Sequence, residues 1–300
     1  MALIPFDDRD GWIWLDGQLV PWRDARLHVL SHGLHYASSV FEGERAYRGN
    51  IFRLRDHTER LLNSARLLMF EIPYTAEQID TACRQVLEAN GLTDGYVRPV
   101  AWRGTEQLAV SPSGTTIHTA IAAWPWPSYF EGERMAGIRM MEGTWRRPPP
   151  DTAPTQSKAS ALYMIGSLNK LQAEQAGYAD ALLLDWRGYV AEATGANIFL
   201  VIDGELHTPS CEAFLDGLTR KTVISLARRA QMKVVERHIQ PAELARATEV
   251  FVTGTAAEVT AVREIGDHCF TPGRITEALM QGYDDLVLCS PEAVDRVVAA

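Results

Sequence analysis

The chain has 300 residues, of which 46% are hydrophobic and 22% are charged, a composition typical of a soluble globular protein with a large core and not of a disordered or fibrous one. Its 38 acidic residues outnumber its 29 basic ones and give a net charge of −9, so nucleic acids and anionic membranes are not expected partners. Lysine occurs only four times, at Lys158, Lys170, Lys221 and Lys233. Any chemistry that needs a primary amine therefore has four candidates.

The N-terminal residues and the cysteines indicate a cytoplasmic protein. The first residues, MALIPFDDRDGW, are acidic where a signal peptide is basic. No apolar run approaches the roughly 20 residues that a membrane span requires. The four cysteines lie far apart and form no C-x-x-C pair, so we expect free thiols. His32 and His35 have a spacing that suits a metal, but no third ligand accompanies them, and we expect no metal site.

Short strands and a helix are predicted at the N-terminal end. Asp16-Gly17 and Gly49-Asn50 each separate two apolar runs and are typical of hairpin turns. Asp56 and Glu59 then have the spacing of a capping box, followed by an apolar helical stripe. We expect this helix to pack on the sheet.

A second helix and a change of domain follow. Thr75 and Gln78 predict a capped helix that ends near Gly91, and YVRPVAW and TIHTAIAAW predict strands. The Pro- and Trp-rich stretch WPWPSYFEGER then interrupts the pattern. We expect a small N-terminal α+β domain over residues 1–125, a linker over 126–137 and a larger C-terminal domain over 138–300.

The C-terminal part is predicted to form strands between helices. A strand at GIRMMEG is followed by the extended segment WRRPPPDTAPTQS and by a helix from about Lys158 to Ala176. ALLLDWRGYVAEA and ANIFLVIDGELHTP predict paired strands with turns at Arg187-Gly188 and Asp203-Gly204. A helix after Leu218 and a strand at TEVFVTG complete the pattern.

Three short patches rich in Gly, Thr and Ala are candidate binding loops. They are ATGAN at 193–197, DGLTR at 216–220 and TGTAAE at 253–258, and the common nucleotide-binding motifs are absent. DGLTR precedes a helix, so its N–H groups and the Thr219 hydroxyl are suited to a phosphate, and Thr255 could act similarly. Taken singly, each patch is better explained by ordinary capping and turn residues.

The four lysines differ in context. Lys170 lies mid-helix near Asn169 and Gln172, Lys221 lies in the first turn of a helix, and Lys233 precedes a short strand. We expect all three at the surface. Lys158 follows a proline-containing segment and begins an apolar helix, where loss of solvation favours a neutral, nucleophilic amine. The residues alone leave open that Lys158 is an ordinary lysine at a helix end.

Seven blocks resemble one known family. In chain order they are SHGLHYASSVFEGERAY, DHTERL, YVRP, SKASALY, AEATGANIF, DGLTR and TGTAAEVTAV, over about residues 31–262. They are similar to the branched-chain-amino-acid aminotransferases, class IV pyridoxal-phosphate enzymes. The resemblance implies an α+β fold of the D-amino-acid-aminotransferase type (fold type IV), with a barrel-like sheet in the larger domain. It also implies transfer of the amino group of L-leucine, L-isoleucine or L-valine to 2-oxoglutarate, with pyridoxal 5'-phosphate as cofactor.

The resemblance assigns cofactor-binding roles to particular residues. It implies that Lys158 forms the internal aldimine and that Glu192 binds the pyridine nitrogen, with Glu258 as the competing candidate. Arg60 is implied to pair with the phosphate and Tyr163 to contact the ring oxygen. From the residues alone, Arg60 also fits a helix-surface ion pair and Tyr163 a core aromatic. The other implied cofactor-binding residues are Gly195, Ala196, Asn197, Leu218, Thr219 and Thr255.

The resemblance also implies a substrate pocket. An arginine and two tyrosines, Arg98, Tyr36 and Tyr129, are expected on the distal carboxylate of 2-oxoglutarate. Tyr96 and the amides of the TGTAAE patch are expected on the α-carboxylate. Two further aromatic residues are expected as apolar walls, although core packing is the commoner fate of such side chains. The full set is Tyr36, Phe41, Gly43, Tyr96, Arg98, Val110, Trp126, Tyr129, Ala256 and Ala257.

One loop departs from the family's pattern. Relatives commonly carry an apolar-Gly-Val loop where this chain has Leu108-Ala109-Val110; in the family this loop reaches the partner's site of a homodimer or larger homo-oligomer. Substrate preference therefore stays open, with a D-amino-acid or (R)-amine transaminase and an aminodeoxychorismate lyase as alternatives of the same fold. A non-catalytic binding protein is the alternative of another class, and the presence of Lys158, Glu192 and Arg60 argues against it.

Overall fold

The computed structural model describes residues 4–126 and 134–298. The chain forms two compact units, each with its own sheet and core. The first unit comprises Met1–Pro127 together with Ser157–Ala161, and the second comprises Ser128–Gln156 together with Leu162–Ala300.

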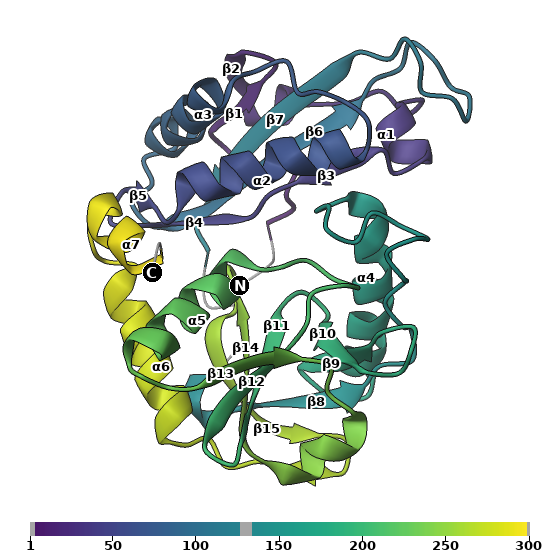
Figure 1. The fold of residues 1–300 in the computed structure, drawn as a ribbon. Coiled ribbons are helices and arrows are strands. Elements are labelled where there is room, and N and C mark those ends of the chain that lie inside the picture. Colours follow the sequence, from purple (N-terminus) through teal and green to yellow (C-terminus); the bar gives the residue numbers. More distant parts are fainter. Residues whose placement is uncertain (1–3, 127–133, 299–300) are drawn as a thin grey trace. The chain divides into compact units, whose positions relative to one another are not determined.

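An antiparallel seven-stranded sheet forms the first unit (Figure 1). Its strand order is β2-β1-β7-β6-β4-β5, and β3 also pairs with β6. Every pairing in this sheet is antiparallel. The strands are β1 (Trp12–Leu15), β2 (Gln18–Pro21), β3 (Ser39–Phe41), β4 (Glu44–Tyr47), β5 (Asn50–Ile51), β6 (Gly95–Arg103) and β7 (Ile117–Trp124).

Two predicted hairpins are present in this sheet. Asp16 and Gly17 join β1 to β2 with φ angles of 47° and 99°, the left-handed pair that a tight hairpin turn requires. The second hairpin joins β4 to β5, but its turn residues are Arg48 and Gly49. The prediction is displaced by one residue because Asn50 already pairs within β5.

Helices α2 (Leu54–Leu67) and α3 (Ala76–Ala89) lie side by side against the sheet (Figure 1). The predicted capping box of α3 is confirmed. The Thr75 N–H donates to Gln78 Oε1 at 2.8 Å, and the Gln78 N–H donates to Thr75 Oγ1 at 3.3 Å. Two N–H groups at the helix start are thereby satisfied.

The capping box predicted for α2 is wrong. The helix begins at Leu54, and its N-cap residue is Arg53, which has a left-handed φ of 53° and no side-chain cap. Asp56 lies inside the first turn and pairs with Arg53 at 2.6 Å. An acidic side chain there is still favourable, because the helix N-terminus carries partial positive charge.

Strand β6 separates the core from the face that carries functional side chains. Val97 and Ala101 are fully buried in the core beneath the helices. Because successive side chains of a strand point to opposite faces, Tyr96, Arg98 and Val100 share the other face. The alternation along β6 thus places an arginine and a tyrosine together on the face turned away from α2 and α3.

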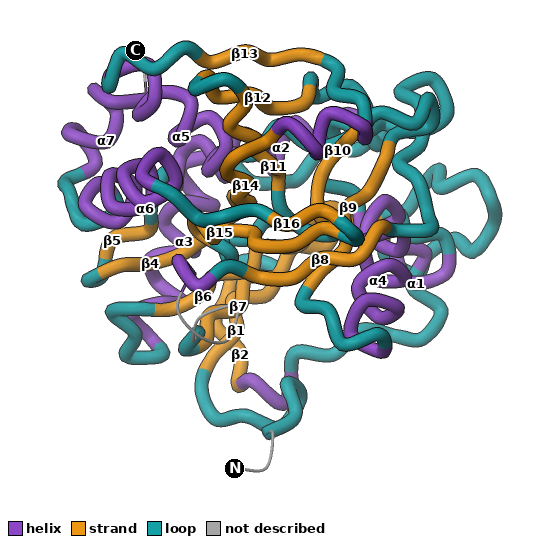
Figure 2. Tube along the Cα trace, turned by 90° about the horizontal axis from the view of Figure 1, so that it is seen from below, coloured by secondary structure: helices purple, strands orange, loops and turns teal. Residues whose placement is uncertain are grey.

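Six strands of the second unit close into a barrel-like ring (Figure 2). The ring order is β10-β9-β8-β15-β14-β11, and the pairing of Glu192 with Asn197 joins β11 back to β10. This confirms the barrel-like sheet. The ring strands are β8 (Ile138–Glu142), β9 (Asp180–Leu184), β10 (Val190–Ala193), β11 (Asn197–Ile202), β14 (Ala247–Gly254) and β15 (Glu258–Ile265), and the remaining strands are β12 (Glu205–Pro209), β13 (Val234–Arg237) and β16 (His268–Cys269).

Two helices of the second unit begin close to the predicted positions. Helix α4 (Ser160–Gln175) starts two residues after Lys158, and α5 (Leu218–Arg229) starts at Leu218, where a helix was expected after that residue. The sequence analysis did not predict the helices α6 (Arg274–Leu286) and α7 (Pro291–Val298), which both pack against α5. Short helices also occur in the chain: α1 (His32–His35) and the 3-10 helices η1 (Trp22–Asp24), η2 (Arg134–Ala136) and η3 (Pro241–Arg246).

The segment Ser157–Ala161 packs with the first unit, whereas the sequence analysis placed it in the C-terminal domain. Ala159 forms an isolated β-bridge with Val40 of β3, and both residues are buried. The Ser157 hydroxyl also donates to the Ser64 carbonyl at 3.0 Å. These partners are distant in the chain, so no local pattern could reveal them.

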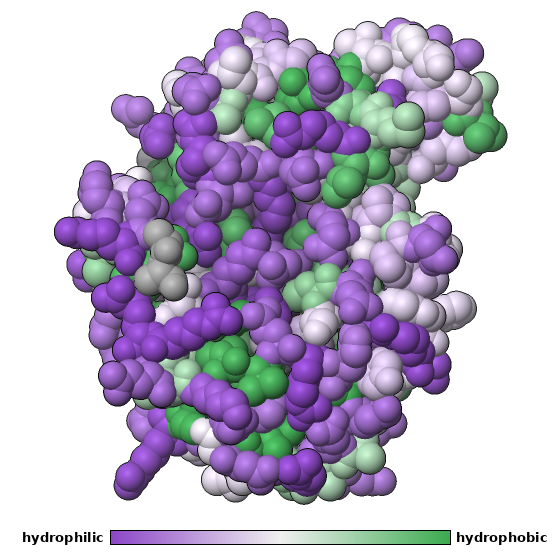
Figure 3. Space-filling view, in the orientation of Figure 1, coloured by the Kyte–Doolittle hydropathy of each residue, from purple (hydrophilic) through white to green (hydrophobic). Residues whose placement is uncertain are grey.

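Three general properties concern the whole described chain. None of the helices placed by the structure is long and apolar enough to span a membrane. Within residues 4–126 and 134–298, no three His, Cys, Asp or Glu side chains come together as a metal site would require. On the face in view in Figure 3, hydrophilic residues surround separate hydrophobic patches, as is normal for a protein surface.

Candidate active site

Lys158 is held through both of its main-chain groups. Its N–H donates to the Ser64 hydroxyl at 2.9 Å, and its carbonyl accepts from the Phe41 N–H at 3.1 Å. Ser64 lies on α2 and is fully buried. The Lys158 Nζ lies 5.0 Å from the centroid of the Phe41 ring. The base of the side chain is therefore fixed, and the amine lies against an aromatic wall.

The other three lysines are in different surroundings. Each has its Nζ within 4 Å of a carboxylate. Lys221 and Lys233 lie at the surface as expected, with side chains 49% and 69% exposed, whereas the Lys170 side chain is only 25% exposed. The pairs are Lys170 with Glu174 at 3.5 Å, Lys221 with Asp216 at 3.3 Å and Lys233 with Glu205 at 2.8 Å.

Arg60 forms a bidentate ion pair with a buried carboxylate. Its Nε and Nη2 donate to the two oxygens of Glu42 at 2.7 and 2.8 Å. The Arg60 side chain is 13% exposed and that of Glu42 is completely buried. This is an ion pair of the interior, unlike the helix-surface pair that the residues alone allowed. Because one edge of the planar Arg60 guanidinium is bound to Glu42, the orientation of the whole group is fixed.

His57 completes the cluster around Glu42. Its Nδ1 lies 2.7 Å from Glu42 Oε2, and its side chain is 2% exposed. Burial raises the pKa of Glu42, but the charge of Arg60 and the hydrogen bonds from Arg60 and His57 outweigh burial and lower that pKa below its ordinary value. Burial also lowers the pKa of His57 despite the nearby carboxylate. The cluster therefore keeps one anion, Glu42, against one permanent cation, Arg60.

Arg98 is surrounded by aromatic rings. Its guanidinium carbon lies 4.7 Å from the centroid of Phe41 and 5.2 Å from that of Tyr96, and its Nη2 donates to the Tyr96 hydroxyl at 3.1 Å. Among the residues that the structure describes, no carboxylate pairs with Arg98, and its buried Nε has no hydrogen-bond partner. A half-buried guanidinium with a buried spare donor is suited to a carboxylate ligand.

Gly43 and Trp126 complete this aromatic cluster. A Cβ at Gly43 would lie 1.9 Å from the Tyr96 hydroxyl, so only glycine allows Tyr96 its position. The Tyr96 ring lies 4.9 Å from that of Trp126, centroid to centroid. The structure thus brings together six predicted site residues of the first unit: Lys158, Phe41, Gly43, Tyr96, Arg98 and Trp126.

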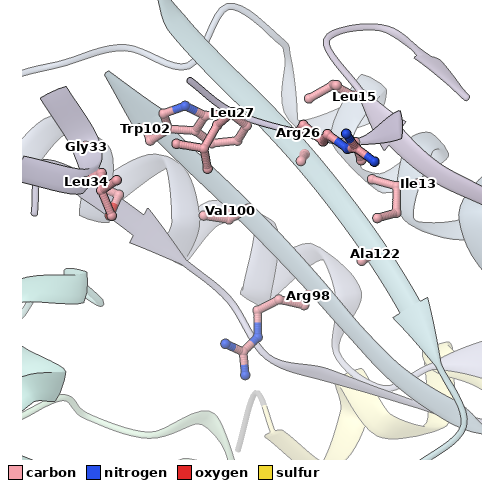
Figure 4. A pocket seen from close by; sticks show the side chains of 13 residues that line it. Ile13, Leu15, Arg26, Leu27, Gly33, Leu34, Arg98, Val100, Trp102 and Ala122 are labelled. Carbon is pink, nitrogen blue, oxygen red and sulfur yellow. The ribbon is translucent and has the colours of Figure 1, made fainter. Parts of the chain in front are cut away.

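A cavity of about 370 Å³ lies on the same face of the sheet (Figure 4). Its lining is mainly apolar and includes Leu27, Leu34, Val100 and Trp102. Figure 4 shows the Arg98 side chain at one end, extending away from the apolar residues. The cavity therefore adjoins Arg98 and offers apolar surface beside its charge.

Three predicted substrate-binding residues lie outside this cluster or outside the described chain. Tyr36 is 46% exposed and packs against His32, and Val110 is 83% exposed. Tyr129 lies outside the described residues. His32 is a buried structural histidine, because its ring nitrogens bond to Ser38 Oγ at 2.6 Å and to the Ala109 carbonyl at 3.0 Å.

Glu192 has a cationic partner that the sequence analysis missed. Its carboxylate lies 3.3 Å from the Nε of Arg147, and both side chains are largely buried. The competing candidate, Glu258, pairs with Arg134 at 3.1 Å and has a left-handed φ of 52°. Tyr163 lies in the first turn of α4 and is half-buried. Arg147 lies in an extended segment, and no regular spacing in the sequence predicts that it pairs with Glu192.

The N-terminus of α5 is suited to a phosphate. Gly217 is its N-cap residue, no side chain caps it, and its first turn contains no acidic residue. Leu218 and Thr219 are buried in that turn. Helix N-termini of this kind attract anions, because their N–H groups point outward and carry partial positive charge.

Asn197 holds the loop that leads into α5. Its Nδ2 donates to the Leu215 carbonyl and its Oδ1 accepts from the Gly217 N–H, both at 3.1 Å. A Cβ at Gly217 would lie 2.2 Å from Asn197 Oδ1. The side-chain amide of Asn197 is thus used in shaping the loop.

The three Gly-, Thr- and Ala-rich patches meet in the second unit. Asn197 of the first patch bonds to the second patch and pairs with Thr253 of the third. Gly254 packs against Gly195 and Ala196. Thr253 Oγ1 is buried and has no hydrogen-bond partner in the described chain. Thr255 and Ala256 are half-buried and Ala257 is buried, so the patches form one polar end of the barrel.

The chain is similar to characterised aminotransferases over most of its length. The Amino-transferase class IV family model matches residues 39–265. A branched-chain-amino-acid aminotransferase of Pseudomonas aeruginosa is 42% identical over 294 residues, covering 95% of this chain and 96% of that protein. The crystal structure of a branched-chain aminotransferase from Thermoproteus uzoniensis with norvaline gives a TM-score of 0.91 at 38% identity, covering 96% and 98% of the two chains.

A second solved structure carries a cofactor derivative. It is the T.th. branched-chain amino acid aminotransferase complexed with N-(5'-phosphopyridoxyl)-L-glutamate, with a TM-score of 0.90 at 38% identity and coverage of 95% and 97%. The family match over residues 39–265 and an identity of 42% over nearly the whole chain leave one conclusion. The chain belongs to the class IV aminotransferases.

Proposed function

We propose that this chain is a branched-chain-amino-acid aminotransferase that moves the amino group of L-leucine, L-isoleucine or L-valine to 2-oxoglutarate, with pyridoxal 5'-phosphate as cofactor. The observation that carries the proposal is Lys158, whose main chain is fixed by Ser64 and Phe41. The names of the relatives support the substrate class. The phosphopyridoxyl derivative in the solved relative supports the cofactor.

The residues present fit this cofactor. A phosphate dianion needs cations and N–H donors, which Arg60 and the uncapped start of α5 supply. Thr253 Oγ1 is buried and has no hydrogen-bond partner in the described chain, so it is available to a polar ligand at the same end of the barrel. The carboxylate of Glu192 would pair with the ring nitrogen of the cofactor. The amine of Lys158 would react with the cofactor's aldehyde. When bound, pyridoxal phosphate supplies an aldehyde that condenses with amines and a ring that accepts an electron pair.

The chain's own groups then perform the proton transfers. The Lys158 Nζ would remove the proton from the substrate α-carbon as a general base and, as a general acid, would deliver it to the carbon that carries the cofactor's aldehyde. The Glu192 carboxylate accepts a hydrogen bond from the protonated ring nitrogen, and the Tyr163 hydroxyl binds the ring oxygen. Arg60, Thr219 and Thr255 bind the phosphate, with the backbone of Leu218 and of residues 195–197 beside them.

Substrate recognition uses the aromatic cluster. Arg98 binds the distal carboxylate of 2-oxoglutarate, because its guanidinium has a spare buried donor, and Tyr36 and Tyr129 assist it. Phe41 and Trp126 offer apolar surface to a branched side chain. The α-carboxylate is bound by Tyr96 and by the amides of residues 256 and 257. One pocket thereby accepts both kinds of substrate.

A homodimer and a cytoplasmic location complete the proposal. Apolar side chains are exposed beside the 370 Å³ cavity, among them Leu27, Val29 and Leu34, and exposed apolar surface of this kind supports an interface between copies. Val110 would then serve the neighbouring copy's site. The cysteines are free in the structure, which supports a reducing compartment. Light scattering should give a mass of at least two chains, and a monomer would contradict the dimer.

The decisive experiment joins a substrate panel to a covalent label. The purified protein is loaded with pyridoxal phosphate and assayed with 2-oxoglutarate and L-leucine, L-isoleucine, L-valine, D-alanine or an (R)-amine. We expect turnover with the three L-amino acids, and borohydride should fix the cofactor on Lys158 with Lys170, Lys221 and Lys233 unlabelled. Equal or faster rates with D-alanine or the (R)-amine would contradict the substrate class. A purified protein that binds no pyridoxal phosphate would contradict the proposal that the chain is an aminotransferase.

A further inference from the structure

Arg147 is a buried arginine in the segment that leads to Lys158, and it is fixed on several sides. Its side chain is 8% exposed. Its main-chain N–H donates to the Leu184 carbonyl at 2.8 Å, which ties it to β9, the strand beside β10. Its guanidinium donates from Nε to the Ala213 carbonyl at 3.2 Å and from Nη1 to the Leu162 carbonyl at 3.0 Å. The charge of Arg147 therefore has a defined position.

The ionic partner of this guanidinium is Glu192. The Nε of Arg147 lies 3.3 Å from Glu192 Oε1, and the Glu192 side chain is 13% exposed. Glu192 lies on β10 between the buried residues Ala191 and Ala193. A carboxylate largely removed from water is costly to keep ionised unless a charge or hydrogen-bond donors compensate. Arg147 supplies the compensating charge.

We propose that Arg147 is a positioning residue that acts through Glu192: its guanidinium keeps the Glu192 carboxylate ionised and aimed at the ring nitrogen of the cofactor. This inference rests on the proposed function, because it takes Glu192 as the partner of that nitrogen. Only an ionised carboxylate can accept a hydrogen bond from a protonated ring nitrogen while balancing its charge. Without Arg147, the carboxylate loses a cation 3.3 Å away, and we expect it to bind the ring nitrogen more weakly.

A purely structural role is the alternative to be separated. Arg147 also joins the carbonyls of Leu162 and Ala213, and loss of these bonds would loosen the start of α4 beside Tyr163 whatever the state of Glu192. A role through Glu192 depends on the Glu192 charge, whereas a structural role does not. A double-mutant cycle between the two residues therefore separates the two roles.

The cycle uses the apo forms of the parent, R147M, E192Q and R147M/E192Q, and titrates each with pyridoxal phosphate. Cofactor absorbance gives the dissociation constant, and the band position of the bound cofactor is followed between pH 6 and 9. We expect R147M alone to weaken binding by about 10-fold to 100-fold, the range found for residues that orient a bound group's ligands. In the E192Q background the same change should cost less than about twofold, since the charge it serves is already gone.

The controls test charge and folding. R147K keeps the positive charge and should recover most of the affinity. R139M removes a bidentate arginine from another strand of the same barrel, where Arg139 pairs with Glu264 at 2.7 and 2.8 Å, and should leave cofactor affinity unchanged. Near-ultraviolet circular dichroism checks that each apoprotein is folded; should R147M be unfolded, Arg147→Gln replaces it in the cycle.

Two results would overturn the inference. An equal loss of affinity from R147M in both backgrounds would assign Arg147 a structural role only, and an unchanged affinity in the parent background would remove its role altogether. The proposed function fails separately, when the parent itself takes up no cofactor or borohydride labels no lysine. A parent that is labelled at Lys158 but shows no coupling between Arg147 and Glu192 refutes the inference alone.

Discussion

The two units hold their proposed anion-binding groups in different ways. The first unit uses long cationic side chains, and each is fixed by other side chains: Glu42 holds Arg60, and Phe41 and Tyr96 surround Arg98. The second unit uses the uncapped start of α5, whose loop is shaped by Asn197 and by glycine at 217. Anion binding in the first unit therefore depends on the charges around its arginines. In the second unit it depends on the small volume of the residues in the loop before α5.

The physical reason lies in the cost of immobilising each kind of donor. A guanidinium loses hydration and side-chain freedom when it is buried, so it needs a counter-ion or aromatic faces to compensate. A backbone N–H at a helix start is already fixed by the fold and needs only neighbours small enough to leave it accessible. Changes of charge should therefore damage the first unit most, and added volume should damage the loop before α5.

The largest effect is expected at Lys158, since the covalent chemistry depends on one amine of the first unit. Lys158→Ala should lower kcat by roughly 10⁴-fold or more, as loss of a catalytic nucleophile commonly does. Steady-state assays with L-leucine and 2-oxoglutarate measure it. Lys233→Ala, which removes a 69% exposed lysine paired with Glu205, is the control and should retain parental turnover. Comparable turnover in the two variants would refute the role of Lys158.

The next effect concerns the buried charge of the first unit. Glu42→Ala leaves Arg60 without its buried counter-ion and should destabilise the protein by about 3–5 kcal/mol, the cost of breaking a buried ion pair from one side. Urea unfolding followed by circular dichroism gives the change. Glu77→Ala removes a carboxylate that pairs with Arg55 in an exposed position and should leave the unfolding midpoint unchanged. Equal midpoints for the two variants would show that the Glu42 pair is dispensable.

An effect that grows with pH is expected at Glu44. This glutamate is fully buried, and burial raises its pKa well above the ordinary 4.5, with the charge of Glu42 adding to the rise. Above pH 4.5 the unfolded chain ionises at this residue while the folded one stays neutral, so the parent loses about 1.4 kcal/mol per pH unit up to the raised pKa.

Glu44→Gln removes this pH-dependent penalty. The variant should match the parent most closely near pH 5 and become increasingly more stable than the parent towards pH 8. Urea unfolding at pH 5, 6.5 and 8 measures the difference. A difference that stays constant with pH would mean that Glu44 ionises normally inside the first unit, against the view that this unit depends on charge.

The smallest effect tests the role of space in the second unit. Gly217→Ala places a Cβ 2.2 Å from Asn197 Oδ1 and should move the loop before α5, which we expect to weaken pyridoxal phosphate binding about tenfold, or 1.4 kcal/mol. The control is Gly282→Ala on α6, where a Cβ meets only ordinary contacts at 3.8 Å or more; it should leave affinity unchanged. Parental affinity in Gly217→Ala would show that added volume is tolerated there.

The sequence predicted the elements well where a local pattern carries the information. The Thr75 capping box and the Asp16-Gly17 hairpin follow from neighbouring residues and are present. The capping box at Asp56 fails, because Arg53 begins the helix in a left-handed conformation that no spacing rule detects. Local preference is a weak guide where neighbouring contacts decide the first turn.

For the site, the sequence predicted several key residues but not the groups that hold them in place. The lysine count and the family resemblance single out Lys158, Arg60 and Arg98. The partners of these residues were not predicted, because an ion pair such as Arg60 with Glu42, or Glu192 with Arg147, leaves no periodic signal in the chain. Asn197 illustrates the same limit: it belongs to a predicted cofactor patch, yet its amide bonds to the loop at Leu215 and Gly217.

Composition and local pattern were sufficient to identify helices α2 to α5, the hairpins, the four candidate amines and, through seven ordered blocks, the family. Only the folded chain shows that Ser64 accepts the Lys158 N–H across 94 positions and that the three Gly-, Thr- and Ala-rich patches meet at one end of the barrel. The reason is that helices and turns form between neighbours along the chain, whereas a buried charge is stabilised by whichever distant group the fold places against it.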